Sequence, residues 1–195
     1  GRDEQLLTLL HSGEAQLVCV GDYVHAESRA YSRWLAAYEE FMSGYERHEN
    51  MDAEMRESLG TVEMLLELKH AVPAGVHLLK GNHENVSNEE GRGNLPFGKF
   101  AVEGAMVASY MEQFYGDEVL EAFARVEHLY PLLAVGPNFL VTHAEPQAFY
   151  SRTDVIEYRN NPEVVFGLTW TPNDGAEEGS VERMLTHYLG TSEAL

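Results

Sequence analysis

The sequence predicts an α/β fold in one domain. Short apolar runs of strand length alternate along the chain with longer segments in which apolar residues recur at helical spacing. A length of 195 residues suits one domain with a sizeable core, and the hydrophobic content of 44% and charged content of 23% are ordinary for a globular chain. No linker divides the sequence, so we expect residues 1–195 to form a single unit.

The first part of the chain is predicted to hold three helices and one strand. Residues 2–11 suit a short helix, and residues 17–20 suit a buried strand. Two apolar stripes at helical spacing follow. They consist of Tyr31, Trp34, Leu35, Tyr38, Phe41 and Met42, and then of Met51, Met55, Leu59, Val62, Leu65 and Leu66. Pro73 and Gly75 break the chain after the second stripe.

The second part begins with a predicted strand at residues 76–79. Residues 85–99 contain three glycines and a proline among few apolar residues, which indicates a loop. The remaining predicted elements are a helix at residues 106–114, a hairpin whose strands are residues 132–135 and 139–141, and an amphipathic helix at residues 181–189. Residues 144–180 show no clear pattern.

The charge of the chain is strongly negative, with 13 Lys and Arg against 32 Asp and Glu, a net charge of −19. Such a surface repels nucleic acids and anionic membranes, so neither is expected as a partner. No apolar run reaches the roughly 18 residues of a membrane span, and no basic-then-apolar leader is present. The single cysteine, Cys19, makes a disulfide framework impossible, which favours a cytoplasmic location.

Polar residues follow three of the predicted strands. Gly21 and Asp22 come after residues 17–20, Gly-Asn-His-Glu at residues 81–84 comes after residues 76–79, and His143 follows the second hairpin strand. The carboxyl ends of strands in α/β sheets are where ligands bind. Each group taken alone is more often a turn or a packing residue, and their common placement is what favours a site.

The chemistry of these residues suits metal-assisted phosphoryl transfer. A carboxylate from Asp22, an amide oxygen from Asn82 and an imidazole from His143 are ligands for divalent ions such as Mn, Fe or Zn. Two such ions can clamp a phosphoryl group and generate a hydroxide between them. His83 would then be free to protonate the departing oxygen as a general acid.

The motifs resemble those of the calcineurin-like metallophosphoesterases, and most closely the phosphoprotein (serine/threonine) phosphatase branch. Its pattern runs G-D-x-H-G, G-D-x-V-D-R-G, G-N-H-E, H-G/A and a final His. Gly21-Asp22-Tyr23-Val24 matches the second block, Gly81-Asn82-His83-Glu84 the third, and His143-Ala144 the fourth. Residues 167–171, Gly-Leu-Thr-Trp-Thr, resemble the Trp-containing segment that follows the fourth block.

The resemblance implies a four-layer αββα sandwich, two bound divalent ions and a phosphorylated substrate. Asp22 would bridge the two metals, Asn82 and His143 would bind the second metal, and His83 would be the general acid. The first block and the final His are absent from residues 1–195, so we expect the native protein to extend upstream and this chain to bind metal poorly.

One departure concerns the grip on phosphate. His25 and Ala26 stand where the family has Asp and Arg, which orient the catalytic His and hold phosphate. His25 could hydrogen-bond His83 or bind phosphate when protonated, and Arg29 or Arg92 could replace the missing Arg. A second departure is a helical insertion at about residues 28–58, which would either cap the metal edge or pack beside the fold.

Three functions remain open. The first is a dimetal phosphoesterase that hydrolyses phosphomonoesters, such as those of phosphoproteins. The second is a symmetrical dinucleoside polyphosphate hydrolase, because the metal ligands would contact only the phosphoryl group. The third is a weakly active or inactive scaffold with the same fold, which the loss of the Arg at Ala26 favours and the retention of Asp22, Asn82, His83 and His143 opposes.

Overall fold

The structure is a computed structural model that describes residues 2–190, with side chains from residue 5 onward. The elements in chain order are α1 (Arg2–Ser12), β1 (Leu17–Cys19), the 3-10 helix η1 (Ser28–Ala30), α2 (Tyr31–Met42), α3 (Glu49–Ala71), β2 (Val76–Leu78), α4 (Glu103–Phe114), α5 (Asp117–Glu127), β3 (Leu133–Val135), β4 (Leu140–Thr142), α6 (Arg152–Ile156), the 3-10 helix η2 (Tyr158–Asn160), α7 (Pro162–Thr169) and α8 (Ser180–Leu189).

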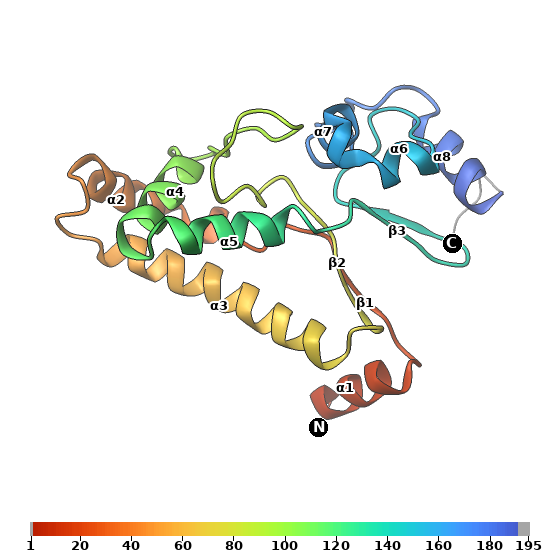
Figure 1. Cartoon of the computed structure of the whole chain (residues 1–195), viewed down its shortest axis with the longest axis horizontal. Helices are drawn as coiled ribbons and strands as arrows, with labels where there is room; N and C mark the ends of the chain where they lie inside the picture. The colour runs from red at the N-terminus through yellow and green to blue at the C-terminus, as the bar shows by residue number, and fades with distance from the viewer. Residues whose placement is uncertain (1, 191–195) are drawn as a thin grey trace.

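The described strands form two two-stranded sheets. β1 and β2 are parallel, with Val18 opposite His77, and the crossover between them contains α2 and α3. β3 and β4 form the antiparallel hairpin that the sequence predicts. In Figure 1 the helices α2 to α5 gather on one side of the molecule and α6 to α8 on the other, with β1 and β2 running between them. The chain is therefore a mixed helix and strand protein in which helix predominates.

Most predicted elements are confirmed. The stripe that starts at Tyr31 forms α2, the stripe that starts at Met51 lies in α3, and residues 85–99 form a loop without a helix or strand of its own. The helix α5 was not predicted, although Leu120 and Phe123 lie at helical spacing and Asp117 and Glu118 occupy its first turn. Residues 144–180, which show no clear pattern in the sequence, contain α6, η2 and α7.

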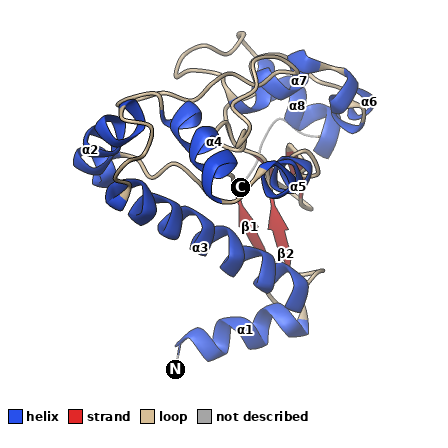
Figure 2. Ribbon diagram, turned by 60° about the vertical axis from the view of Figure 1, so that its left-hand side comes forward, coloured by secondary structure: helices blue, strands red, loops and turns tan. Residues whose placement is uncertain are grey.

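One hydrophobic core lies between the helices of the predicted insertion and helices α4 and α5. Buried side chains of α2, α3, α4 and α5 form one cluster, which includes Trp34, Met51, Met55, Met106 and Met111. Figure 2 shows α2 and α3 beside α4, while the two strands lie further along α3. Residues 28–58 therefore pack against α4 and α5, and Arg29 and Glu57 also line a cavity together with Asp22 and His83.

The strand at residues 17–20 is less buried than predicted. All three residues of β1 are half-buried, and Val20 is 44% exposed. α1 and α3 pack against β1 and β2 through Leu10 and Val62. An apolar run thus identified the strand but not the degree to which it is covered.

The helices near the end of the described chain pack together with the segment that follows β4. α7 and α8 pack with Tyr150 and Tyr158 in a core of their own, and Ala144 N and Gln147 N donate to the carbonyls of Leu168 and Gly167, which ties the segment after β4 to α7. Within the described chain, every helix is too short or too polar to cross a bilayer.

The carboxyl group of Glu127, the last residue of α5, is buried. Burial raises the pKa of Glu127 to about 8, with Lys80 opposing the rise and Glu84 and Glu89 adding to it. Glu127 Oε2 accepts a hydrogen bond from Val86 N at 2.8 Å, and Oε1 has no partner among the described residues. The protonated form of this carboxyl is therefore the form that the fold favours.

We expect Glu127→Gln to flatten the pH dependence of stability. The raised pKa means that Glu127 stabilises the fold fully below its ordinary pKa of 4.5 and loses this contribution as the pH rises to about 8. The free energy of unfolding of the native chain should fall across this window by up to about 1.4 kcal/mol per pH unit from this group. Urea unfolding at several pH values would test this, and an equal slope in the variant would contradict it.

Candidate functional site

The turn after β1 brings the backbone of Gly21 against that of Gly81. Gly21 and Asp22 both have positive φ, at 99° and 60°, and a Cβ atom on either glycine would collide with the other loop. Only glycine tolerates this combination of φ and close approach without strain. The two turns that follow β1 and β2 are therefore packed directly on each other, which places Asp22 beside Asn82 and His83.

Glu84 holds these two turns together. Its carboxylate accepts hydrogen bonds from the backbone N–H groups of Asp22 at 2.9 Å, Tyr23 at 2.8 Å and Gly81 at 2.6 Å. Burial is the main cause of a raised pKa at Glu84, which the three N–H donors oppose. The last residue of Gly-Asn-His-Glu therefore serves as an internal brace, a role that the sequence analysis did not assign.

A second carboxylate braces the turn from the α3 side. Buried Glu54 accepts from Ala26 N at 2.9 Å and from Arg33 Nε at 2.9 Å, and Trp34 Nε1 donates to the carbonyl of Ala26 at 2.6 Å. The segment from Asp22 to Ala26 is thus fixed at both ends, by Glu84 at the start and by Glu54 at the end.

The structure brings the three predicted metal ligands together. His143 Nε2 lies 2.9 Å from Asn82 Oδ1 and 3.5 Å from Asp22 Oδ1, although these residues come from the ends of three different strands. His143 Nδ1 donates to the carbonyl of Val20 at 2.7 Å. This contact joins the hairpin β3–β4 to the end of β1.

The hydrogen bonds define which nitrogen of His143 carries the proton. A carbonyl can only accept, so Nδ1 carries a proton, and Nε2 faces the amide of Asn82 and the carboxylate of Asp22. A centre built from one nitrogen and two oxygen acceptors suits a divalent cation, so the donor set fits the metal that the motifs imply.

His83 lies on the other side of Asp22. Its Nδ1 donates to the carbonyl of Val24 at 2.9 Å, and its Nε2 lies 3.7 Å from Asp22 Oδ2 and 3.8 Å from Glu27 Oε1. The ring is almost fully buried, with the ring of Phe97 at a centroid distance of 3.8 Å. The loop at residues 85–99 therefore covers His83, and its Nε2 is directed toward the carboxylates.

His25 does not take the part that the sequence analysis considered. Neither of its ring nitrogens has a hydrogen-bond partner among the described residues, so the expected bond to His83 is not formed. Val24 holds His83 instead, through its backbone carbonyl. Burial and the neighbouring His83 lower the pKa of His25 to about 3, and the ring is 1% exposed and stacked on Phe97. A neutral, covered ring of this kind does not suit phosphate binding.

The two predicted arginines lie in different places. Arg29 lines a cavity of about 150 Å³ together with Asp22, Glu27 and His83, where its Nε donates to Glu57 at 2.8 Å. Arg92 lines a separate cavity with Lys80 and Arg159, which contains none of the predicted metal ligands. Arg29 is thus the one of the two that the structure places beside His83.

A further cavity of about 330 Å³ opens on the other side of the cluster. Asn82 and His143 line it together with Glu145 and Trp170. The indole Nε1 of Trp170 has no partner within residues 2–190. The Trp-containing segment that the sequence analysis singled out therefore lies against the predicted metal ligands, and the cluster is bordered by cavities on both sides.

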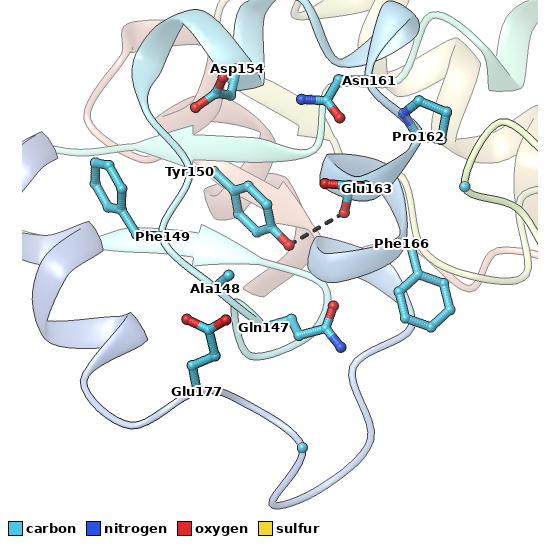
Figure 3. A pocket seen from close by; sticks show the side chains of 12 residues that line it. Gln147, Ala148, Phe149, Tyr150, Asp154, Asn161, Pro162, Glu163, Phe166 and Glu177 are labelled. Carbon is cyan, nitrogen blue, oxygen red and sulfur yellow. Dashed lines mark hydrogen bonds between the residues drawn. The ribbon is translucent and has the colours of Figure 1, made fainter.

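A larger cavity, of about 780 Å³, lies away from this cluster. Figure 3 shows Tyr150 at its centre, with its hydroxyl donating to the carbonyl of Glu163 at 3.3 Å. Carboxylates from Asp154, Glu163 and Glu177 line it. Size alone would select this space, but none of the motif residues reaches it, so we place the candidate site at the cluster around Asp22.

Several neighbours of the site were not predicted. Glu84 was visible as part of a motif, whereas Glu27, Glu54 and Phe97 carry no local signal, because their roles depend on contacts with distant segments. Over the part of the chain that the structure describes, no group of three or more His, Cys, Asp or Glu side chains is placed to hold a metal ion. The set around Asp22 contains two such residues and the amide of Asn82.

Comparisons of the chain with protein-family models, with curated proteins and with solved structures find no match.

Proposed function

We propose that this chain is a metallophosphoesterase of the calcineurin-like type that hydrolyses phosphomonoesters with two divalent ions, Mn, Fe or Zn. The observation that carries the proposal is the convergence of Asp22, Asn82 and His143 on one point, with His143 Nε2 2.9 Å from Asn82 Oδ1 and 3.5 Å from Asp22 Oδ1. A carboxylate, an amide oxygen and an imidazole nitrogen that meet at one point are a donor set that a divalent cation can share.

In this proposal each residue of the site has a role in metal binding, proton transfer or substrate binding. Asp22, Asn82 and His143 would hold the cations, and Glu84 and Val20 would keep these ligands in place. Bound divalent ions would supply positive charge to the phosphoryl oxygens and a nucleophile at neutral pH. His83, held by Val24 at Nδ1, would give the proton at Nε2 to the leaving oxygen. Arg29, which lines the same cavity as His83, would bind the phosphate group of the substrate.

The αββα sandwich belongs to the same proposal. Its support is the order of elements in which β1, β2 and the hairpin β3–β4 each deliver one motif to a common edge. The described strands are too few to define two full sheets, so the sandwich rests on the motifs and on this edge.

An inactive scaffold is the second candidate, and one observation favours it. The site lacks the Arg that Ala26 replaces, and Arg29, its nearest substitute, is already paired with Glu57. A phosphate would have to compete with that carboxylate for the guanidinium group.

The deciding experiment measures hydrolysis of p-nitrophenyl phosphate with added Mn²⁺, with Asp22→Asn as the variant and Glu90→Gln as a surface control. We expect activity that requires Mn²⁺, is lost in Asp22→Asn and persists in the control, because Asp22 is the only carboxylate within reach of both His83 and His143 among the residues the structure describes. Because the chain is expected to bind metal weakly, Mn²⁺ is added in large excess, and an absence of hydrolysis under that condition would favour the scaffold. Hydrolysis of diadenosine tetraphosphate in preference to phosphopeptides would instead assign the dinucleoside polyphosphate activity.

A further inference from the structure

Several basic side chains surround a small cavity near the end of β2. It has a volume of about 110 Å³ and is lined by Lys80, Arg92, His128 and Arg159, together with Asn94 and Tyr158. The net charge of the chain is −19, so the grouping of Lys80, Arg92 and Arg159 around one cavity is a local concentration of positive charge in an acidic protein. None of these side chains takes part in the cluster around Asp22.

A tight turn at residues 91–94 positions Arg92 at this cavity. Gly91 and Asn94 exchange backbone hydrogen bonds at 2.8 and 3.1 Å, and Gly91, Arg92 and Gly93 all have positive φ. Gly93 packs directly against the backbone of Pro162 and the side chain of Val165 in α7, where a Cβ atom would not fit. The tight turn therefore fixes Arg92 next to Arg159, which precedes α7.

The guanidinium of Arg92 has no internal partner. Across residues 2–190 it makes no hydrogen bond or ion pair, although 32 carboxylates are present in the chain. Arg159 donates from Nε to the carbonyl of His128 at 3.1 Å, lies over the ring of Tyr158 and interacts with the Tyr158 hydroxyl, which leaves part of its five N–H donors for a ligand. Both groups therefore keep donors for a ligand in the cavity.

The floor of the cavity is a buried ammonium group. Lys80 is 3% exposed and donates to the carbonyl of Glu84. Its pKa is lowered by burial, against the influence of Glu127, Glu84 and Glu89. The pKa of His128 is lowered by burial, and Lys80, Arg92 and Arg159 lower it further while Glu89 opposes them. Lys80, Arg92 and Arg159 therefore all lie near His128, and the acidic neighbours are Glu89 at His128 and Glu127, Glu84 and Glu89 at Lys80.

We propose that this cavity binds one tetrahedral oxyanion of the phosphate type, either free or as the terminal group of a larger molecule. Two arginines offer planar pairs of N–H donors, which match the oxygens of a phosphate, and the buried lysine adds a point charge. The volume corresponds to a few water molecules, so it admits one such group but not a nucleotide base. The proposal goes beyond the phosphoesterase function and does not depend on it.

Calorimetric titration of the metal-free protein with inorganic phosphate, at fixed ionic strength and with EDTA present, tests the site. We expect one binding event per chain, weakened about tenfold by Arg92→Gln and by Arg159→Gln, since each removes charge-assisted hydrogen bonds. Arg125→Gln is the matched control, because this exposed arginine of α5 pairs with Glu121 on the surface, away from the cavity. Glu89→Gln should tighten binding, because it removes the opposing charge.

Two further arms locate the site and identify the source of the ligand. Asp22→Asn should leave phosphate binding unchanged, which separates this site from the cluster that the proposed function requires. Equal binding of phosphoserine and phosphate would indicate the terminal group of a larger molecule, and binding of phosphate alone would indicate the free ion. Absence of saturable binding, equal binding of acetate, or full affinity in the Arg92→Gln/Arg159→Gln double variant would overturn the proposal.

Discussion

His83→Ala is expected to lower turnover of a poor leaving group by about 10²–10⁴-fold, the usual contribution of a general acid. The reason lies in the tether at Nδ1. Because Val24 accepts the Nδ1 proton at 2.9 Å, Nε2 is the atom left to carry a proton toward the cavity that Asp22 and Glu27 line. A leaving group that departs as a stable anion needs little protonation, so p-nitrophenyl phosphate should be affected much less than phenyl phosphate.

The control for this prediction is a histidine outside the site. His77→Ala removes a hydrogen bond with Gln16 on the surface of β2 and should leave turnover of both substrates unchanged. Manganese content of His83→Ala should equal that of the native chain, because Nε2 of His83 is not among the three converging acceptors. Equal losses with both substrates would argue against the general-acid role, and loss of bound manganese would point to a role in metal binding.

Glu84→Ala is expected to lower the free energy of unfolding by about 3–5 kcal/mol, the largest stability effect that we predict. The substitution leaves the N–H groups of Asp22, Tyr23 and Gly81 without an acceptor in a buried place. Each unsatisfied donor costs about 1–3 kcal/mol, and water entering the space of the side chain recovers part of the sum. The turns that position Asp22 and Asn82 should loosen at the same time.

Urea unfolding followed by tryptophan fluorescence measures this effect. Glu84→Gln should fall between the native chain and Glu84→Ala, because its single oxygen can still accept from Asp22 and Gly81 while its amide group faces the N–H of Tyr23. Glu90→Ala, in the exposed part of the following loop, should stay within about 0.5 kcal/mol of the native chain. A Glu84→Ala variant as stable as that control would show that the brace is dispensable.

The strands and most helices could be predicted because their signals are local. The apolar stripe from Tyr31 to Met42 became α2 as expected, and the Gly-Pro-Asn turn joined two strands into the hairpin. Asp22, Asn82, His83 and His143 could be selected because each follows an apolar strand, and strand ends of neighbouring strands meet. α5 was missed although its spacing was present, which makes it an error of interpretation rather than a limit of the sequence.

The neighbours of these residues could not be predicted in the same way. His25 occupies a motif position, so its sequence context suggested a contact with His83. Its ring instead lies on Phe97, a residue 72 positions away, and neither ring nitrogen has a hydrogen-bond partner among the described residues. Arg92 and Arg29 were equivalent candidates in the sequence, and only the packing of Gly93 on α7 turned Arg92 toward a different cavity.

The sequence by itself determined the mixed α/β composition, the places of the strands and the four side chains at their ends, because backbone preferences and hydrophobic periodicity act over a few residues. The tertiary structure decided which acceptors face one another, that Val24 rather than His25 holds His83, and that Lys80, Arg92 and Arg159 surround one cavity. These features depend on contacts between segments far apart in the chain, which close packing selects only when the whole fold has formed.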